Sequence, residues 1–156
     1  MTASSPESNL RDALIACSTY RTWLGVLSTG SASAMTFLPW VTEAQAAAAG
    51  DKYAIIGANE NQRLNRVAQN AVALSGTLPL QFEEAVGAES EENELRDFTD
   101  TVRAIVADLL NTSEGGGYII LRDIQAHGQP TRMVAEEGDQ DEIYVAQYDV
   151  DWGLEG

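Results

Sequence analysis

The chain has 156 residues, 44% of them apolar and 21% charged, so it is long enough for one domain with a genuine core. Its 24 acidic and 9 basic residues give a formal net charge of −15, which excludes broad attraction to nucleic acid or anionic membranes outside a local basic patch. The single cysteine excludes an intrachain disulfide and a thiolate metal cluster. The N-terminus lacks the basic and apolar regions of a signal peptide, and the composition predicts a cytosolic protein.

The first part of the chain predicts short helices. Residues 1–8 are polar, and we expect them to be loosely ordered, although Ser5 followed by Pro6 is typical of a helix start. Apolar residues then recur at helical spacing with one polar break, which predicts a kinked helix or two short helices ending near Gly25. Residues 28–33 predict a flexible turn.

The middle of the chain predicts strands. We expect, in order, an edge strand or loop at 34–41, an alanine-rich helix ending at Gly50, a strand at 53–56, a polar loop at 57–62, a strand at 64–74 and a turn at 75–76. Leu78, Leu80 and Phe82 then alternate with other residues in the clearest strand pattern of the chain. Pro79 donates no backbone hydrogen bond, so this strand should lie at a sheet edge or carry a bulge.

Residues 91–111 predict a long amphipathic helix. Its large apolar residues recur at steps of three and four: Leu95, Phe98, Val102, Ile105, Val106 and Leu109. The opposite face is mostly charged, and the glycines at 115–117 should stop the helix. We therefore expect this helix to cover a sheet.

The last part of the chain returns to strand patterns. We expect a strand at 118–124, a reversal at 128–130, a short strand at 133–135, an acidic turn at 136–142 and a final strand. In the final strand the residues expected on one face are Tyr144, Ala146, Tyr148, Val150 and Trp152. The order predicts an α+β fold, with an antiparallel or mixed β-sheet covered by an N-terminal helix and the central amphipathic helix.

The sequence contains no convincing catalytic or metal-binding pattern. His127 is the only histidine and lies in a turn, where a solvated role is favoured over catalysis. Acidic residues 139–142 lack the central glycine and closing glutamate of a calcium loop. The glycines at 115–117 lead from helix to strand, whereas phosphate loops lead from strand to helix. We expect neither enzymatic activity nor a cofactor.

The charges are unevenly distributed along the chain. No acid occurs from 61 to 81, where Arg63 and Arg66 lie, whereas 83–100 and 136–151 are strongly acidic. Head-to-tail packing could set these regions against each other and close a ring, and an ordinary uneven surface would give the same pattern. The candidate contacts between subunits are Arg63 and Arg66 with Glu92, Asp97 and Asp100.

Several segments together resemble the tail terminator (tail completion) proteins of long-tailed bacteriophages. They are LRDALI at 10–15, YRTWLG at 20–25, SGTLPLQFE at 75–83, the amphipathic helix at 91–111 and YDVDWGL at 148–154. The resemblance covers most of the chain and includes no diagnostic catalytic or metal motif. It implies a small α+β subunit of a hexameric ring that caps the tail tube, stops its polymerisation and joins the tail to the head connector.

The resemblance also implies that DNA passes through the ring. Six copies at −15 each would carry about −90, and acids lining the lumen would repel the DNA backbone. The candidate lumen acids are Glu136, Glu137, Asp139, Asp141 and Glu142, with the 88–94 segment as a second candidate. We expect a virion protein, assembled in the bacterial cytoplasm, whose partners are its own copies, the tail tube protein and the head–tail connector protein.

Two other functions suit the sequence. A head–tail neck adaptor or stopper protein would share the same features. An acidic DNA-mimic inhibitor, from a different class, would also suit the charge; it would be a monomer or dimer whose acids lie at phosphate-like spacing. The uncharged stretch at 22–42 and the basic zone around Arg63 favour assembly surfaces.

Overall fold

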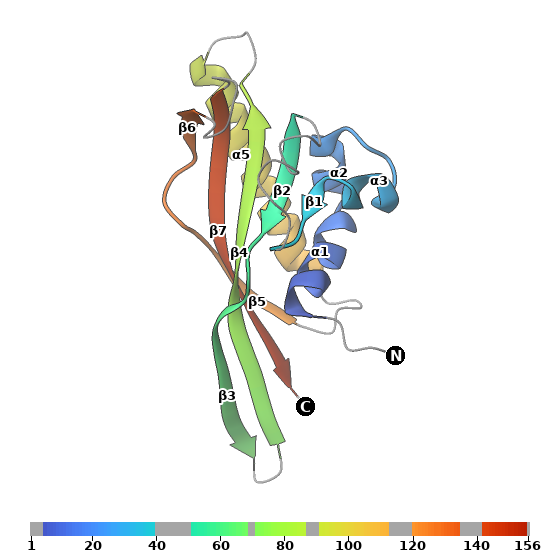
Figure 1. Cartoon of the computed structure of the whole chain (residues 1–156), viewed down its shortest axis with the longest axis vertical. Coiled ribbons are helices and arrows are strands. Elements are labelled where there is room, and N and C mark those ends of the chain that lie inside the picture. Colours follow the sequence, from blue (N-terminus) through green and yellow to red (C-terminus); the bar gives the residue numbers. More distant parts are fainter. Residues whose placement is uncertain are drawn as a thin grey trace.

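The computed structural model describes residues 5–39, 51–68, 71–86, 91–112, 120–134 and 142–155 (Figure 1). The helices are α1 (Pro6–Ile15), α2 (Ser18–Leu24), α3 (Thr29–Ser33) and α5 (Glu91–Thr112). The strands are β1 (Thr36–Phe37), β2 (Lys52–Ile56), β3 (Glu60–Ala68), β4 (Ala71–Ala85), β5 (Ile120–Ala126), β6 (Thr131–Val134) and β7 (Glu142–Glu155). They form one mixed sheet with helices packed on it, which confirms the predicted α+β fold.

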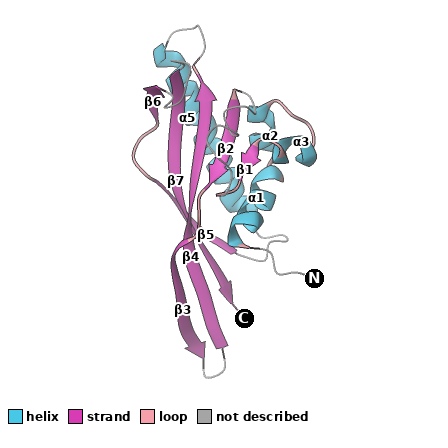
Figure 2. Ribbon diagram, in the orientation of Figure 1, coloured by secondary structure: helices cyan, strands magenta, loops and turns pink. Residues whose placement is uncertain are grey.

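The two longest strands form the centre of the sheet (Figure 2). β4 and β7 pair antiparallel from Ala73 opposite Glu155 to Ala85 opposite Ile143. β2 and β3 follow each other along the outer edge of β4, and β5 and β6 do the same along β7. β1 adds to β2 in parallel. Each outer edge of the central pair is therefore built from two short strands in succession.

Strand β4 begins earlier than the sequence predicts. The expected single strand at 64–74 is wrong, because Leu64 and Leu74 lie opposite each other on β3 and β4. The expected turn at 75–76 is wrong for the same reason, and the expected polar loop at 57–62 is confirmed for 57–59 only, because β3 begins at Glu60. Gly76 does not mark a turn: a Cβ there would lie 2.8 Å from Trp152 Nε1, so the close approach of this side chain requires glycine.

Pro79 is not on an edge strand, which corrects the second expectation about β4. Its register with β7 continues unbroken through the pair Pro79–Asp149, and β2 lies on the other side. The Gly57 amide donates to the Pro79 carbonyl at 2.8 Å, so the missing Pro79 amide faces the point where β2 has ended at Ile56. The proline therefore removes one hydrogen bond at the end of a ladder and leaves the β4–β7 pairing intact.

The expected reversal at 128–130 is also wrong. β5 and β6 both run antiparallel to β7, so the chain continues in the same direction past this break. Gly128 adopts φ +79°, and the His127 amide still donates to the Gln147 carbonyl of β7 at 2.8 Å. The strands expected at 118–124 and 133–135 correspond to β5 and β6 with shifted bounds.

The N-terminal helices start and stop where their capping residues indicate. The Ser5 side chain accepts a hydrogen bond from the Ser8 amide at 3.1 Å, with Pro6 in the first turn. The expected loose order of residues 1–8 is therefore wrong for 5–8, and 1–4 lie outside the described residues. α1 and α2 are two short helices, the second ending at Gly25 in the left-handed conformation.

Three further expectations concern the chain between these helices and the sheet. The segment 28–33 is not a turn, because the Ser28 side chain accepts from the Ser31 amide at 3.1 Å and caps α3. The edge strand permitted at 34–41 is present as β1. The alanine-rich helix ending at Gly50, and the glycines at 115–117, lie outside the described residues.

The core lies between the helices and one end of the sheet. The central positions of the predicted stripe on α5 are fully buried, as are the inward residues of β4 and β7 that the alternation predicted: Phe98, Val102, Ile105, Leu109, Leu78, Leu80, Phe82, Tyr144, Ala146, Tyr148, Val150 and Trp152. Phe82 contacts the rings of Tyr20, Trp23 and Tyr148, with centroids 5.8–6.2 Å apart. None of the helices in the described segments is long and apolar enough to cross a bilayer.

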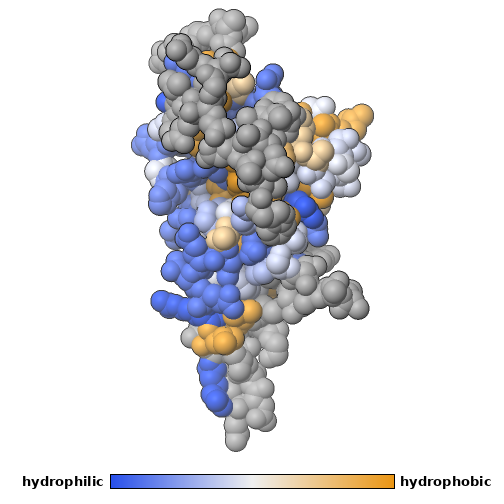
Figure 3. Space-filling model, viewed as in Figure 1, coloured by the Kyte–Doolittle hydropathy of each residue, from blue (hydrophilic) through white to orange (hydrophobic). Residues whose placement is uncertain are grey.

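The sheet continues beyond the helices as a projection (Figure 1). We define the arm as β3 together with residues 71–77 of β4, which pair with each other and adjoin the end of β7. Leu64 in the arm is 70% exposed although it continues the apolar face of the sheet. Elsewhere the surface described in Figure 3 is largely hydrophilic, with small apolar patches.

Candidate functional site

The basic residues predicted to contact another subunit lie on the arm. Arg63 pairs opposite Ser75 and Arg66 opposite Val72, and both side chains are exposed. Because their register is continuous and they are three residues apart, they project from opposite faces of the arm. Among the described residues, no side chain forms an ion pair with Arg63.

The acidic residues predicted to meet them lie on α5. Asp97 and Asp100 are exposed, and Asp100 Oδ1 lies 4.0 Å from Arg103 Nη1 on the same helix. Glu92 is in the first turn of α5, and its side chain is outside the description. Figure 1 shows the first half of α5 and the arm at opposite ends of the long axis. The structure therefore does not bring the two groups of charges together within one chain.

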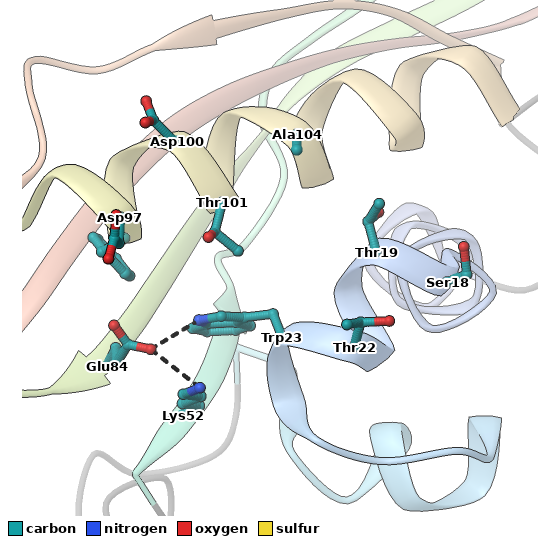
Figure 4. A pocket seen from close by; sticks show the side chains of 11 residues that line it. Ser18, Thr19, Thr22, Trp23, Lys52, Glu84, Asp97, Asp100, Thr101 and Ala104 are labelled. Atoms are coloured by element: carbon teal, nitrogen blue, oxygen red, sulfur yellow. Dashed lines mark hydrogen bonds and ion pairs between the residues drawn. The ribbon is translucent and has the colours of Figure 1, made fainter. Parts of the chain in front are cut away.

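Asp97 and Asp100 border a cavity of about 670 Å³, which we call the α2–α5 cavity. Its walls come from α2, the middle of α5 and the neighbouring parts of β2 and β4 (Figure 4). The lining residues are Ser18, Thr19, Thr22, Trp23, Lys52, Glu84, Asp97, Phe98, Asp100, Thr101 and Ala104. The Thr19 hydroxyl donates to Asp108 Oδ2 at 2.7 Å and ties α2 to α5 beside the cavity.

The charges inside this cavity are unequally compensated. Glu84 Oε1 accepts a hydrogen bond from Trp23 Nε1 at 3.2 Å and lies 3.3 Å from Lys52 Nζ (Figure 4). In the described part of the chain, Asp97 has no such partner. Three carboxylates and one ammonium group thus leave the cavity negative, with the surplus on α5. Trp23 and Phe98 add aromatic surface, so the cavity suits a cationic side chain with an apolar stem.

A smaller cavity of about 290 Å³ lies at the level where both outer edges of the sheet are interrupted. It includes His127, whose Nδ1 lies 3.2 Å from Asp149 Oδ2, and Gln81, which accepts from Gln147 at 2.8 Å. The His127 side chain is 69% exposed, as a turn residue is expected to be. The described residues that line this cavity include no serine, threonine or cysteine.

Four of the five candidate lumen acids lie outside the described residues: Glu136, Glu137, Asp139 and Asp141. Part of the 88–94 segment also lies outside them. Glu142 begins β7 and forms an ion pair with Arg132 of β6. Its charge is therefore partly neutralised before any partner binds.

Other polar groups in the described segments have structural roles. Thr36 donates to the Ala32 carbonyl at 2.8 Å and shares a 2.7 Å hydrogen bond with the Tyr20 hydroxyl, in which either oxygen can be the donor. Burial raises the pKa of Tyr20, and the hydrogen bond with Thr36 opposes this effect in part. Burial also raises the pKa of Tyr148, against the nearby charge of Arg103. No group of three or more possible ligands in the described segments is placed to hold a metal ion.

The sequence predicted the charged residues of the site but not the cavity. Trp23, Lys52 and Glu84 come from three separate elements, and no spacing in the sequence connects them to Asp97. The acidic residues on the predicted surface of α5 were the only feature of the sequence that pointed to this site.

Comparison with known proteins adds no assignment: no protein-family model matches the chain, and no curated protein is significantly similar to it.

Proposed function

We propose that the chain is the subunit of a hexameric ring of the tail terminator type. The observation that carries this proposal is the separation of Arg63 on the arm from Asp97 and Asp100 on α5. Complementary surfaces at opposite ends of one subunit favour a head-to-tail interface, which generates a ring when the rotation closes. The residues that would meet are those predicted from the charge distribution.

In a virion this ring would cap the finished tail tube, end its polymerisation and join the tail to the head connector. The segment resemblance supports this role, and so does the net charge of −15, because an acidic ring would let the duplex pass without binding. The partners would be the tail tube protein on one ring face and the connector protein on the other. The ring would assemble in the host bacterial cytoplasm and remain in the tail or neck, acting as a structural component without catalysis.

Native mass spectrometry and negative-stain microscopy of the purified chain test the ring directly. The proposal expects particles of six subunits with a central opening. A stable monomer that displaces DNA from a DNA-binding enzyme would instead support the DNA-mimic alternative.

A tube-length assay separates the terminator from the neck adaptor or stopper. Rings added to polymerising tail tube protein should bind one tube end and shorten the length distribution. Rings that leave tube growth unchanged but bind the head connector would support the neck protein instead.

A further inference from the structure

We propose that the α2–α5 cavity is the receptor for the arm of the next copy of this chain, with Arg63 entering beside Asp97 and Asp100. This inference rests on the proposed function, because it describes how neighbouring subunits of the ring join. It identifies one occupant for a cavity that the described residues leave open. The occupant is a basic β-hairpin of a second copy.

The cavity matches an arginine in charge. Glu84 is already engaged by Lys52 and Trp23, and Asp100 lies 4.0 Å from Arg103, so the carboxylate without a described ionic partner is that of Asp97, next to Asp100. These two residues are three apart on a helix, and residues at that spacing are surface neighbours. A guanidinium group can bind two carboxylates with its fork of N–H donors. Trp23 and Phe98 line the same cavity but are only 6% and 2% exposed, so the match rests on the carboxylates.

The arm carries the features that such a receptor requires. Arg63 is exposed, and the only acidic residue of the arm is Glu60 at the start of β3. Leu64, the next residue, projects from the opposite face of the arm and is 70% exposed, and β3 pairs with β4 alone among the described strands. An open edge with an exposed leucine is a surface that proteins cover in assemblies. A contact with the next copy would cover it.

The arm and the cavity are separate surfaces of one subunit. The arm projects from one end of the long axis, whereas the cavity lies beside α2 and the helix-covered part of the sheet (Figure 1, Figure 4). A cavity of about 670 Å³ holds a few side chains but not the whole hairpin. The hairpin would therefore lie across the cavity mouth and insert single side chains, and every copy would both donate an arm and receive one.

Charge reversal on each side tests the pairing. R63E and D97K/D100K should each raise the concentration needed for half-assembly at least about tenfold, because like charges would meet at the contact. The triple variant R63E/D97K/D100K restores opposite charges and should recover assembly. The control D123K, on exposed β5, should assemble like the wild type, whereas R63K keeps the charge but loses the fork of donors and should weaken assembly less than R63E. Circular dichroism establishes that each variant is folded before native mass is measured.

A disulfide test measures proximity without relying on affinity. In R63C/D97C, oxidation should produce a ladder of covalent oligomers up to six, since Cys17 is buried and does not compete. R63C/D123C should remain monomeric on the same gel.

The outcomes separate this inference from the proposed function. Six-membered rings that persist in R63E and in D97K/D100K would overturn the arm contact and leave the ring proposal standing. Assembly that depends on both sides but closes with another subunit number would support the arm contact and contradict the hexamer. A wild-type chain that stays monomeric at all concentrations would overturn both.

Discussion

The helix-covered part of the sheet and the arm both contain part of β4 but bury it differently. In the covered part, Leu78, Leu80 and Phe82 of β4 are fully buried against helices. In the arm, Leu64 on the corresponding face is 70% exposed because no described helix reaches it. The alternation of residues is the same in both regions, so the difference in burial arises from the helices that cover one region and not the other. The sheet is therefore longer than the core requires. Stability can be assigned to the helix-covered part and assembly to the arm.

Gly76 lies at the boundary between these regions. Trp152 on β7 is buried beside it and donates from Nε1 to Asn59 Oδ1 at 2.7 Å. This hydrogen bond links the end of β7 to the loop between β2 and β3. The boundary is therefore a packed junction, and the arm should be held at a defined angle to the core.

The largest effect should come from the covered part. Phe98→Ala removes a ring that is 2% exposed and contacts both Trp23 and Tyr144, so it should lower the free energy of unfolding by about 3–5 kcal/mol. Urea unfolding followed by tryptophan fluorescence measures the loss. A change below about 1 kcal/mol would mean that α5 does not cover the sheet as described.

A smaller effect is expected at the junction. Gly76→Ala places a methyl group against Trp152 and should cost about 1–3 kcal/mol, because Trp152 and Asn59 must move. Thermal unfolding gives the difference from the wild type. Gly30→Ala is the matched control: its Cβ would meet only Ser28 Oγ at 4.0 Å, and stability should stay the same or rise slightly. An equal loss of stability in both variants would mean that Gly76 does not lie at a packed junction.

The buried tyrosine of the covered part predicts a pH dependence. The pKa of Tyr20 is raised by burial above its ordinary value of 10.0. The stabilising effect of its neutral form is therefore fully present below pH 10 and is lost as the pH rises toward the folded-state pKa. Tyr20→Phe should cost about 1 kcal/mol at neutral pH through the lost bond to Thr36, and should flatten the alkaline decline.

Unfolding free energies between pH 8 and 11 test this sign. A wild-type decline no steeper than that of Tyr20→Phe would contradict a buried Tyr20. Because Tyr148 also has a raised pKa, a part of the decline should remain in the variant.

The smallest effect on stability should come from the arm. Leu64→Ser changes a residue that is already exposed, so the unfolding free energy should stay within about 0.5 kcal/mol. The same substitution should weaken assembly, which separates the two regions. Leu80→Ala in the covered part of β4 is the control and should cost about 2–5 kcal/mol. A large stability loss in Leu64→Ser would show that the arm belongs to the core.

The sequence predicted the parts of the fold that depend on local periodicity. The stripe on α5 and the inward face of β7 follow from spacing alone, and the structure confirms both. Pairing depends on partners that spacing does not reveal. Pro79 is tolerated in a central strand because β2 ends opposite it, and Gly76 lies within a strand because Trp152 packs against it. Both residues would normally indicate an edge or a turn.

Only some of the charged residues of the site could be predicted from the sequence. Arg63, Asp97 and Asp100 were chosen because bases and acids are segregated along the chain, and the structure places them on exposed positions of β3 and α5. The cavity beside Asp97 forms where α2, α5, β2 and β4 meet, so it exists only after folding. No motif in the sequence could have indicated it.

The native mass of the wild-type chain, measured beside R63E over the same concentration series, tests the central claim most directly. We predict a wild-type particle of about 101 kDa, six times the 16.8 kDa of one chain. We also predict that R63E dissociates to single chains at concentrations where the wild type remains assembled. A wild-type mass of 16.8 kDa at every concentration would contradict the ring and its arm contact.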